Sequence, residues 1–216
     1  FSWTVFYIVI LCFIFPFLPL LIDPFLMLTA VRAIENIQAL LLFGIFVFTL
    51  LYMQPWKLAD GKKHFWFWAA AWWLMLCGRS TSWGRDYFPD VPKIYFRMIS
   101  IVLIGTVVFM LCSKHLRSEI MLKLKHLSLP FWPLLLAVSG LIISDAVEHL
   151  RGVYHIFVLD LKYQNVIEEL YEFPLIVGLF LMAWSFMVRD RDTPTYILRS
   201  DWKNQPNVNF SHSKHS

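Results

Sequence analysis

The chain has 216 residues, of which 58% are hydrophobic and only 16% are charged, and its formal net charge at pH 7 is +4. Soluble domains carry about 25% charged residues, so this composition excludes a single soluble domain, and the continuous apolar runs exclude the alternating pattern of a membrane β-barrel. Three cysteines, an odd number, exclude a disulfide framework, and the positive charge suits membrane topology better than a nucleic-acid partner.

Six apolar runs follow one another along the chain, each close to the roughly 20 residues that a helix needs to cross a bilayer. They predict an all-α integral membrane bundle of about six transmembrane helices, because a helix satisfies all of its own backbone polar groups in lipid. Pro16 and Pro19 are expected to bend the first run. The predicted spans are Trp3 to Ile22, Ile34 to Met53, Phe65 to Trp83, Met98 to Cys112, Leu129 to Glu148, and Val166 to Met187.

Loop charges predict how this bundle is oriented. The spans form one transmembrane domain, residues 1–188, and a polar tail follows at 189–216. With six spans, the 53–64 loop, the 113–128 loop and the tail share one side, which holds twelve of the nineteen basic residues against five acids. Basic loops favour the cytoplasm. We therefore expect a multi-pass membrane protein with both termini in the cytoplasm and its acidic side facing outward.

Polar residues gather at the predicted outer ends of four spans, each set on one helix face by spacings of three and four residues. Burying an unpaired carboxylate costs several kcal/mol, so these faces are expected to meet. Even without Asp86, their six acids outnumber their three arginines, so a bound cation, protonation or water must balance the rest. The four sets are Arg32, Glu35 and Gln38; Arg79, Ser82 and Asp86, with Arg85 beside that face; Ser144, Asp145, Glu148 and His149; and Glu168, Glu169 and Glu172.

Roles for these residues follow from their chemistry. Carboxylates and imidazole are ligands for divalent cations, so one divalent metal ion is predicted on Asp145, His149, Glu169 and Glu172. Proton transfer is assigned to Glu148, Glu35 and Glu172. Substrate binding is assigned to Arg79, Arg85 and Ser82, since arginine presents a fork to an anionic headgroup. The chain shows no haem or nucleotide signature.

Several functions remain open at this point. The first hypothesis is a metal-dependent, membrane-embedded enzyme that acts on a lipid or another membrane substrate at the outer face. The second is proton- or cation-coupled transport through the same acids. The third is a structural or assembly subunit of a membrane complex, in which the charges form an ion-pair network at headgroup level. Expected partners are membrane lipids, and either further copies of the chain or partner transmembrane subunits.

Overall fold

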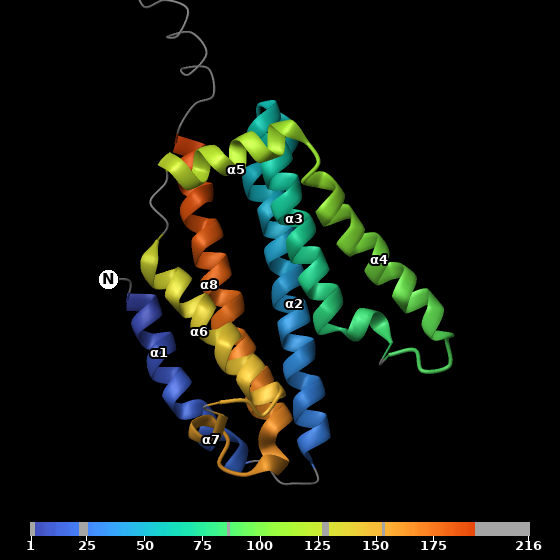
Figure 1. Cartoon of the computed structure of the whole chain (residues 1–216), viewed down its shortest axis with the longest axis vertical. Coiled ribbons are helices and arrows are strands. Elements are labelled where there is room, and N and C mark those ends of the chain that lie inside the picture. Colours follow the sequence, from blue (N-terminus) through green and yellow to red (C-terminus); the bar gives the residue numbers. More distant parts are fainter. Residues whose placement is uncertain (1–2, 22–25, 86, 127–129, 153, 193–216) are drawn as a thin grey trace, which may run out of the picture.

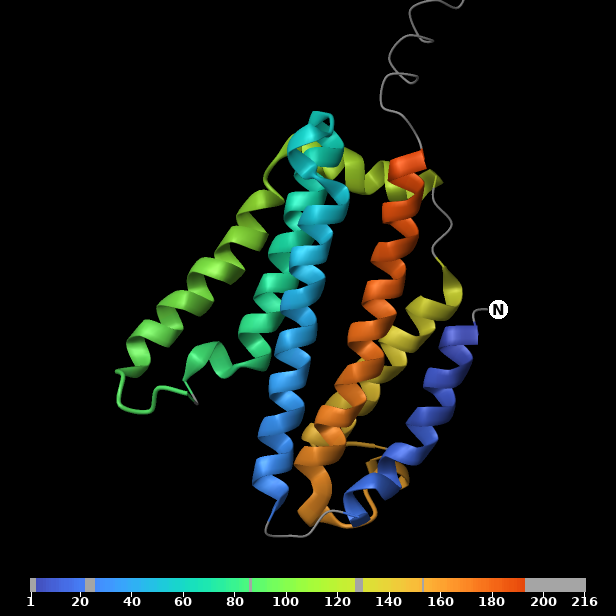
Figure 2. The same cartoon turned by 180° about the vertical axis from the view of Figure 1, so that it is seen from behind.

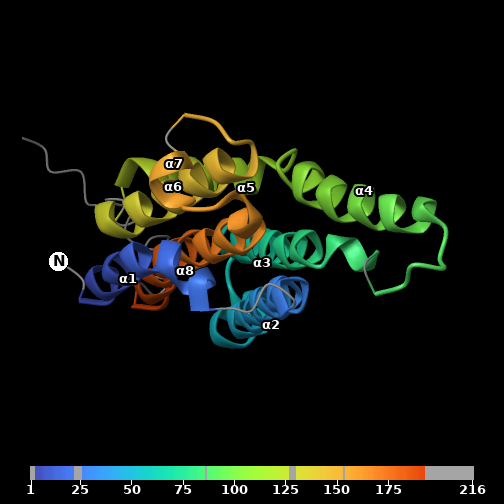
Figure 3. The ribbon, with the colours of Figure 1, turned by 90° about the horizontal axis from the view of Figure 1, so that it is seen from below.

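The fold is a bundle of helices, seen here in a computed structural model that describes residues 3–21, 26–85, 87–126, 130–152 and 154–192. Within these ranges all regular elements are helical, so the predicted all-α class is confirmed. The long helices α2 (Met27–Met53), α3 (Asp60–Ser80), α6 (Phe131–Glu148) and α8 (Gln164–Asp192) run along the length of the molecule (Figure 1). In the end view of Figure 3, α8 lies between α6 and α2, and it packs on both.

Four helical stretches are long and apolar enough to cross a membrane: Met27–Lys57, Lys93–Met110, Phe131–Glu148 and Leu161–Arg191. They match four of the six predicted spans, and the predicted count of six is not confirmed. Among the other two, α3 is long enough, but its charged first turn and its tryptophans lower its hydropathy. The first predicted span is a short helix, α1 (Trp3–Ile14), followed by the 3-10 segment η1 (Phe15–Leu21). Its prolines remove backbone donors, which ends the α-helix early.

The basic segment 113–128, predicted as a loop, is mostly helix. Helix α5 (Lys114–His126) lies across one end of the bundle, beside the first turn of α3 and the last turn of α8 (Figure 1). Its inward face holds Leu116 and Lys123, both buried, and the partly buried Ile120, at helical spacing. The α2–α3 connection, with the 3-10 turn η3 (Pro55–Lys57), reaches the same end. Three of the chain's basic segments therefore meet at one end of the bundle.

Helix α4 (Lys93–Met110) diverges from the bundle, and the view from behind in Figure 2 shows the same separation. Most of its apolar side chains are exposed, and it is one of the helices that are apolar enough to cross a membrane. At the other end, α7 (Tyr154–Phe157) and the 3-10 turn η5 (Leu161–Tyr163) connect α6 to α8 and lie near η1. This connection and η1 form an apolar cluster around Tyr171 of α8. At the end of the bundle opposite α5, the apolar cluster therefore lies on the side of α1 and α6. The predicted polar residues of α2, α3 and α8 lie on the other side.

Helices α6 and α8 approach each other most closely, at two glycines. A Cβ placed on Gly140 of α6 would lie 2.7 Å from the Leu175 nitrogen, and one on Gly178 of α8 would lie 2.6 Å from the Ala137 nitrogen. Small residues allow two membrane helices to pack backbone to backbone in this way. This contact turns Tyr171, Leu175 and Gly178 of α8 toward α6, which leaves another face of α8 for α2 and α3.

Candidate functional site

Four glutamates and one arginine surround a single cavity between α2, α3 and α8. The cavity has a volume of about 120 Å³. Its floor is apolar, with Leu42, Leu76 and Leu179 among the lining residues. Its polar lining residues are Glu35, Arg79, Ser80, Ser82, Glu168, Glu169 and Glu172. The structure thus brings together predicted site residues from three helices that are far apart in sequence, and we refer to this space as the acid cavity.

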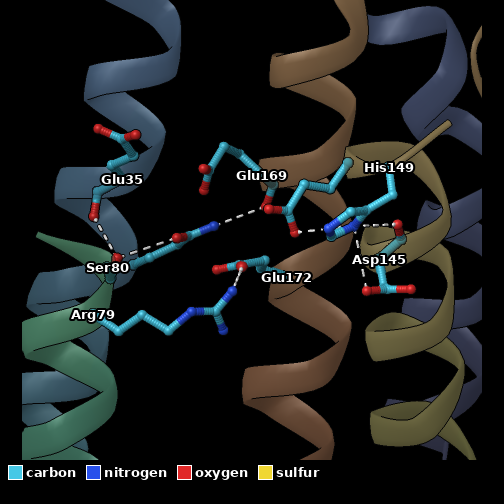
Figure 4. Close-up of polar contacts among 9 residues, drawn as sticks. Glu35, Arg79, Ser80, Asp145, His149, Glu169 and Glu172 are labelled. Carbon is cyan, nitrogen blue, oxygen red and sulfur yellow. Dashed lines mark hydrogen bonds and ion pairs between the residues drawn. The ribbon is translucent and has the colours of Figure 1, made fainter. Parts of the chain in front are cut away.

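Charge in the acid cavity is unbalanced. Arg79 donates from Nη2 to Oε1 of Glu172 at 3.2 Å, and this ion pair links α3 to α8 (Figure 4). The Glu172 side chain is 16% exposed, whereas that of Arg79 is 54% exposed and reaches in from the rim. Among the described residues that line this space, Arg79 is the one cation against four carboxyl groups. Carboxylates this close together repel one another, so the set favours protons or a cationic ligand.

A buried amide holds the walls of the acid cavity in place. Gln38 of α2 is fully buried, and its Nε2 donates to the backbone carbonyl of Glu169 at 2.8 Å. The Ser80 hydroxyl of α3 lies 3.2 Å from the Gln38 Oε1 and 3.3 Å from the Glu35 carbonyl (Figure 4). The Gln38 side chain therefore links α2 to α8 through its amide nitrogen and to α3 through its amide oxygen. Gln38 stood out in the sequence by its polarity, whereas its role as a bridge depends on the fold.

The turn that follows α3 is strained. Ser82 and Trp83, in the 3-10 turn η4 (Ser82–Gly84), have φ angles of 48° and 60°, in the left-handed region that side chains disfavour. Each such residue costs about 1–3 kcal/mol, and residues of this kind cluster at functional sites. The Trp83 ring packs over Gly78, where a Cβ would lie 2.7 Å from a ring carbon. Ser82, predicted to bind substrate, lines the acid cavity from this turn.

A second, larger cavity adjoins the first and has the opposite charge. Its volume is about 670 Å³, and it lies between α2 and the segment that connects α3 to α4. Tyr87 donates its hydroxyl hydrogen to Oδ1 of Asn36, which fixes that segment against α2. The two cavities share Glu35 as a wall. Among the residues that the structure describes, three cations line this basic cavity: Arg32, Arg85 and Lys93.

The predicted metal ligands do not lie together. Asp145, Glu148 and His149 offer donor atoms within 4.8 Å of one another on the exposed end of α6, and His149 Nδ1 is 3.4 Å from Asp145 Oδ1. Glu169 and Glu172 line the acid cavity instead. Figure 4 shows Asp145 and His149 on the α6 side of α8, and Glu172 with Arg79 on the opposite side. The reason is helical geometry, because the face of α8 that packs on α6 is not the face that carries Glu169 and Glu172.

The predicted proton-transfer residues divide in the same way. Glu35 and Glu172 line the acid cavity, whereas Glu148 is exposed with His149. Of the predicted substrate-binding residues, Arg79 and Ser82 line the acid cavity and Arg85 lines the basic cavity. Glu168, a member of the predicted polar sets, also lines the acid cavity. The sequence signal for it was present, since it precedes Glu172 by one helical turn.

A second polar cluster lies at the α5 end and was not predicted. Asp190 of α8 accepts from Lys123 Nζ at 2.5 Å and from Trp66 Nε1 at 2.8 Å, and Lys62 Nζ is 3.9 Å away. Lys123 also lies 3.3 Å from Glu119. Asp190 and Lys123 are 8% and 3% exposed. This buried network attaches α5 to α3 and α8, so its first role is structural.

Comparison with known proteins adds no assignment to this geometry. The chain matches no protein-family model, and no curated protein and no solved structure matches it. Function is therefore inferred from the two adjoining cavities and their chemistry.

Proposed function

We propose that this chain is an integral membrane protein and an enzyme that acts on a membrane lipid in the acid cavity. The observation that carries the proposal is the convergence of four carboxyl groups and one guanidinium on one small cavity between α2, α3 and α8. In this proposal Glu169 and Glu172 exchange protons with the substrate and Glu35 assists from the facing helix. Arg79 holds Glu172 in position.

The charge imbalance supports acid–base chemistry. Carboxyl groups that share a partly dry site cannot all ionise at equal cost, so some are set up to donate protons while others accept them. General acid–base catalysis needs this division of roles. A divalent cation would balance the same charges and would add Lewis-acid chemistry. Both versions of the proposal use the same residues of this chain.

The apolar floor separates this proposal from transport. Below the acid cavity, Leu42, Ile45, Trp73 and Ile176 pack into one apolar cluster of α2, α3 and α8. A transport route for protons or cations needs polar groups or water along its length. The described side chains of this cluster from α2 and α8 are aliphatic, so they offer no polar group that could carry a proton or cation onward from the cavity. A cavity backed by apolar side chains suits a bound substrate better than passage across the membrane.

Replacing Glu172 with glutamine is the direct test. We expect lipid turnover by the reconstituted protein to fall by about 100-fold or more, as loss of a general acid or base does. The measurement is mass spectrometry of lipids extracted from mixed-phospholipid proteoliposomes after incubation. Glu148→Gln is the matched control, because Glu148 lies on the α6 side and is exposed; its turnover should equal that of the wild type.

Three results would contradict this assignment. Full activity of Glu172→Gln would remove Glu172 from the reaction. A Glu172→Gln protein that no longer elutes as a single folded species would favour the ion-pair network as the role of these charges. Inactivation by a chelator, together with loss of turnover in His149→Ala but not in Glu172→Gln, would move the site to the exposed group on α6.

A further inference from the structure

We infer that the acid cavity and the basic cavity together bind the headgroup of an amine-bearing phospholipid, with the phosphate in the basic cavity and the ammonium group in the acid cavity. This inference rests on the proposed function, since it names the substrate class of that site. It starts from the opposite charge of two adjoining cavities that share Glu35 as a wall.

The basic cavity has the chemistry of a phosphate site. Arg32, Arg85 and Lys93 line it, and Glu35 is the one acid among its described lining residues, so the balance favours an anion. Arginine binds phosphate through two parallel hydrogen bonds. Lys93 is the first residue of α4, where the helix dipole adds positive potential. Asn36 and Tyr87 contribute further polar atoms to the wall.

The acid cavity has the size and charge for an ammonium group. Its volume of about 120 Å³ is much smaller than the roughly 670 Å³ of the basic cavity, so the smaller end of the headgroup is placed there. Glu35 lines both cavities, which places a carboxyl group between the phosphate and the amine. An ammonium group is attracted to carboxylates, and α8 alone brings Glu168, Glu169 and Glu172 to this cavity beside the guanidinium of Arg79.

The surroundings point to a lipid as the source of this headgroup. Leu28 and Val31 of α2 line the basic cavity, and Leu28 is 65% exposed. Ile94, next to Lys93 on α4, is 56% exposed. Both helices belong to stretches that are apolar enough to cross a membrane. Acyl chains attached to a phosphate in the basic cavity would therefore meet apolar surface on α2 and α4.

Lipid binding by the purified full chain tests the inference. Native mass spectrometry would compare phosphatidylethanolamine with phosphatidylglycerol of the same acyl chains, and with water-soluble glycerophosphoethanolamine. We expect the wild type to bind phosphatidylethanolamine about tenfold more tightly than phosphatidylglycerol, as one charge-assisted contact allows. Arg32→Gln combined with Lys93→Gln should lower the affinity for both lipids by about tenfold or more. Glu35→Gln should remove the preference for the amine while phosphatidylglycerol still binds.

The controls separate the alternatives. Arg117→Gln removes an exposed cation from α5, at the other end of the bundle, and should leave all affinities unchanged. Equal affinity of the wild type for the two lipids would overturn the inference, and so would full binding by the Arg32 and Lys93 double variant. If glycerophosphoethanolamine binds as tightly as phosphatidylethanolamine, the bound headgroup need not come from a lipid, and that part of the inference is wrong. Selective binding without turnover would contradict the proposed enzyme alone, whereas turnover of a lipid that lacks an amine would contradict this inference alone.

Discussion

Replacing Asp190 with alanine is expected to lower the free energy of unfolding by about 3–5 kcal/mol, the cost of removing one partner from a buried ion pair. Lys123 is 3% exposed and would keep only Glu119 as a charged partner, at 3.3 Å. Trp66 Nε1 would lose its acceptor. The measurement is thermal or denaturant unfolding of the purified protein in detergent micelles.

Two controls define what this loss means. Asp60→Ala removes an exposed acid from the first turn of α3, so it should cost about 1 kcal/mol or less. Combining Asp190→Leu with Lys123→Met replaces the charges by apolar groups, which should recover most of the lost stability. If Asp190→Ala is as stable as Asp60→Ala, the buried network does not hold α5 on the bundle.

Replacing Gly178 with valine is expected to separate α6 from α8 and to destabilise the protein by about 1–3 kcal/mol or more, the usual cost of overpacking. Already the first added carbon would lie 2.6 Å from the Ala137 nitrogen and 2.8 Å from the Pro133 oxygen. Both are backbone atoms, so a rotamer change cannot relieve the contact. Gly140→Val should behave similarly, because its Cβ would lie 2.7 Å from the Leu175 nitrogen. Unfolding in detergent measures both effects.

Two other helical glycines supply matched controls. A Cβ on Gly44 of α2 or Gly105 of α4 meets nothing within 4 Å. Valine at either position should be neutral or slightly stabilising, since valine favours a helix somewhat more than glycine does. Equal losses at Gly105 and Gly178 would show that close packing of α6 on α8 is not what these glycines provide.

The contact between α6 and α8 also bears on the proposed site. It sets the rotation of α8, which turns Glu169 and Glu172 toward α2 and α3. A substitution at Gly178 that leaves the protein folded should therefore lower lipid turnover as well as stability. The residue lies two turns from the acids, so its effect on turnover would act through their position.

Much of the helical organisation could be predicted because it depends on local sequence. The spans that became α2, α4, α6 and α8 have continuous apolar runs of membrane-spanning length, and these four were recovered. The first predicted span, Trp3 to Ile22, is helical from Trp3 to Leu21, but it changes from an α-helix to a 3-10 helix after Ile14, next to Pro16 and Pro19. The 113–128 segment was predicted as a loop, because the many charges of α5 hide its single apolar stripe.

The sequence indicated which residues belong to the candidate site, but it did not indicate which of them lie together. Glu35, Arg79 and Glu172 stood out because charges are costly at membrane depth, and they line one cavity. Whether the acids of α8 face Asp145 and His149 depends on the rotation of α8 about its axis. That rotation is set by the glycine contact with α6, which no local pattern in the sequence indicates. The metal on Asp145, His149, Glu169 and Glu172 therefore stays a prediction that this arrangement does not favour.

By itself the sequence determined that the chain is helical, apolar and basic at one end, because composition and hydrophobic run length act within each segment. Only the tertiary structure decided that Lys123 and Asp190 are buried together. It also decided that the acids of α6 and the acids of the cavity lie on different sides of α8. Such contacts join residues tens of positions apart. Their partners are selected by how whole helices pack, and a single helix does not encode that choice.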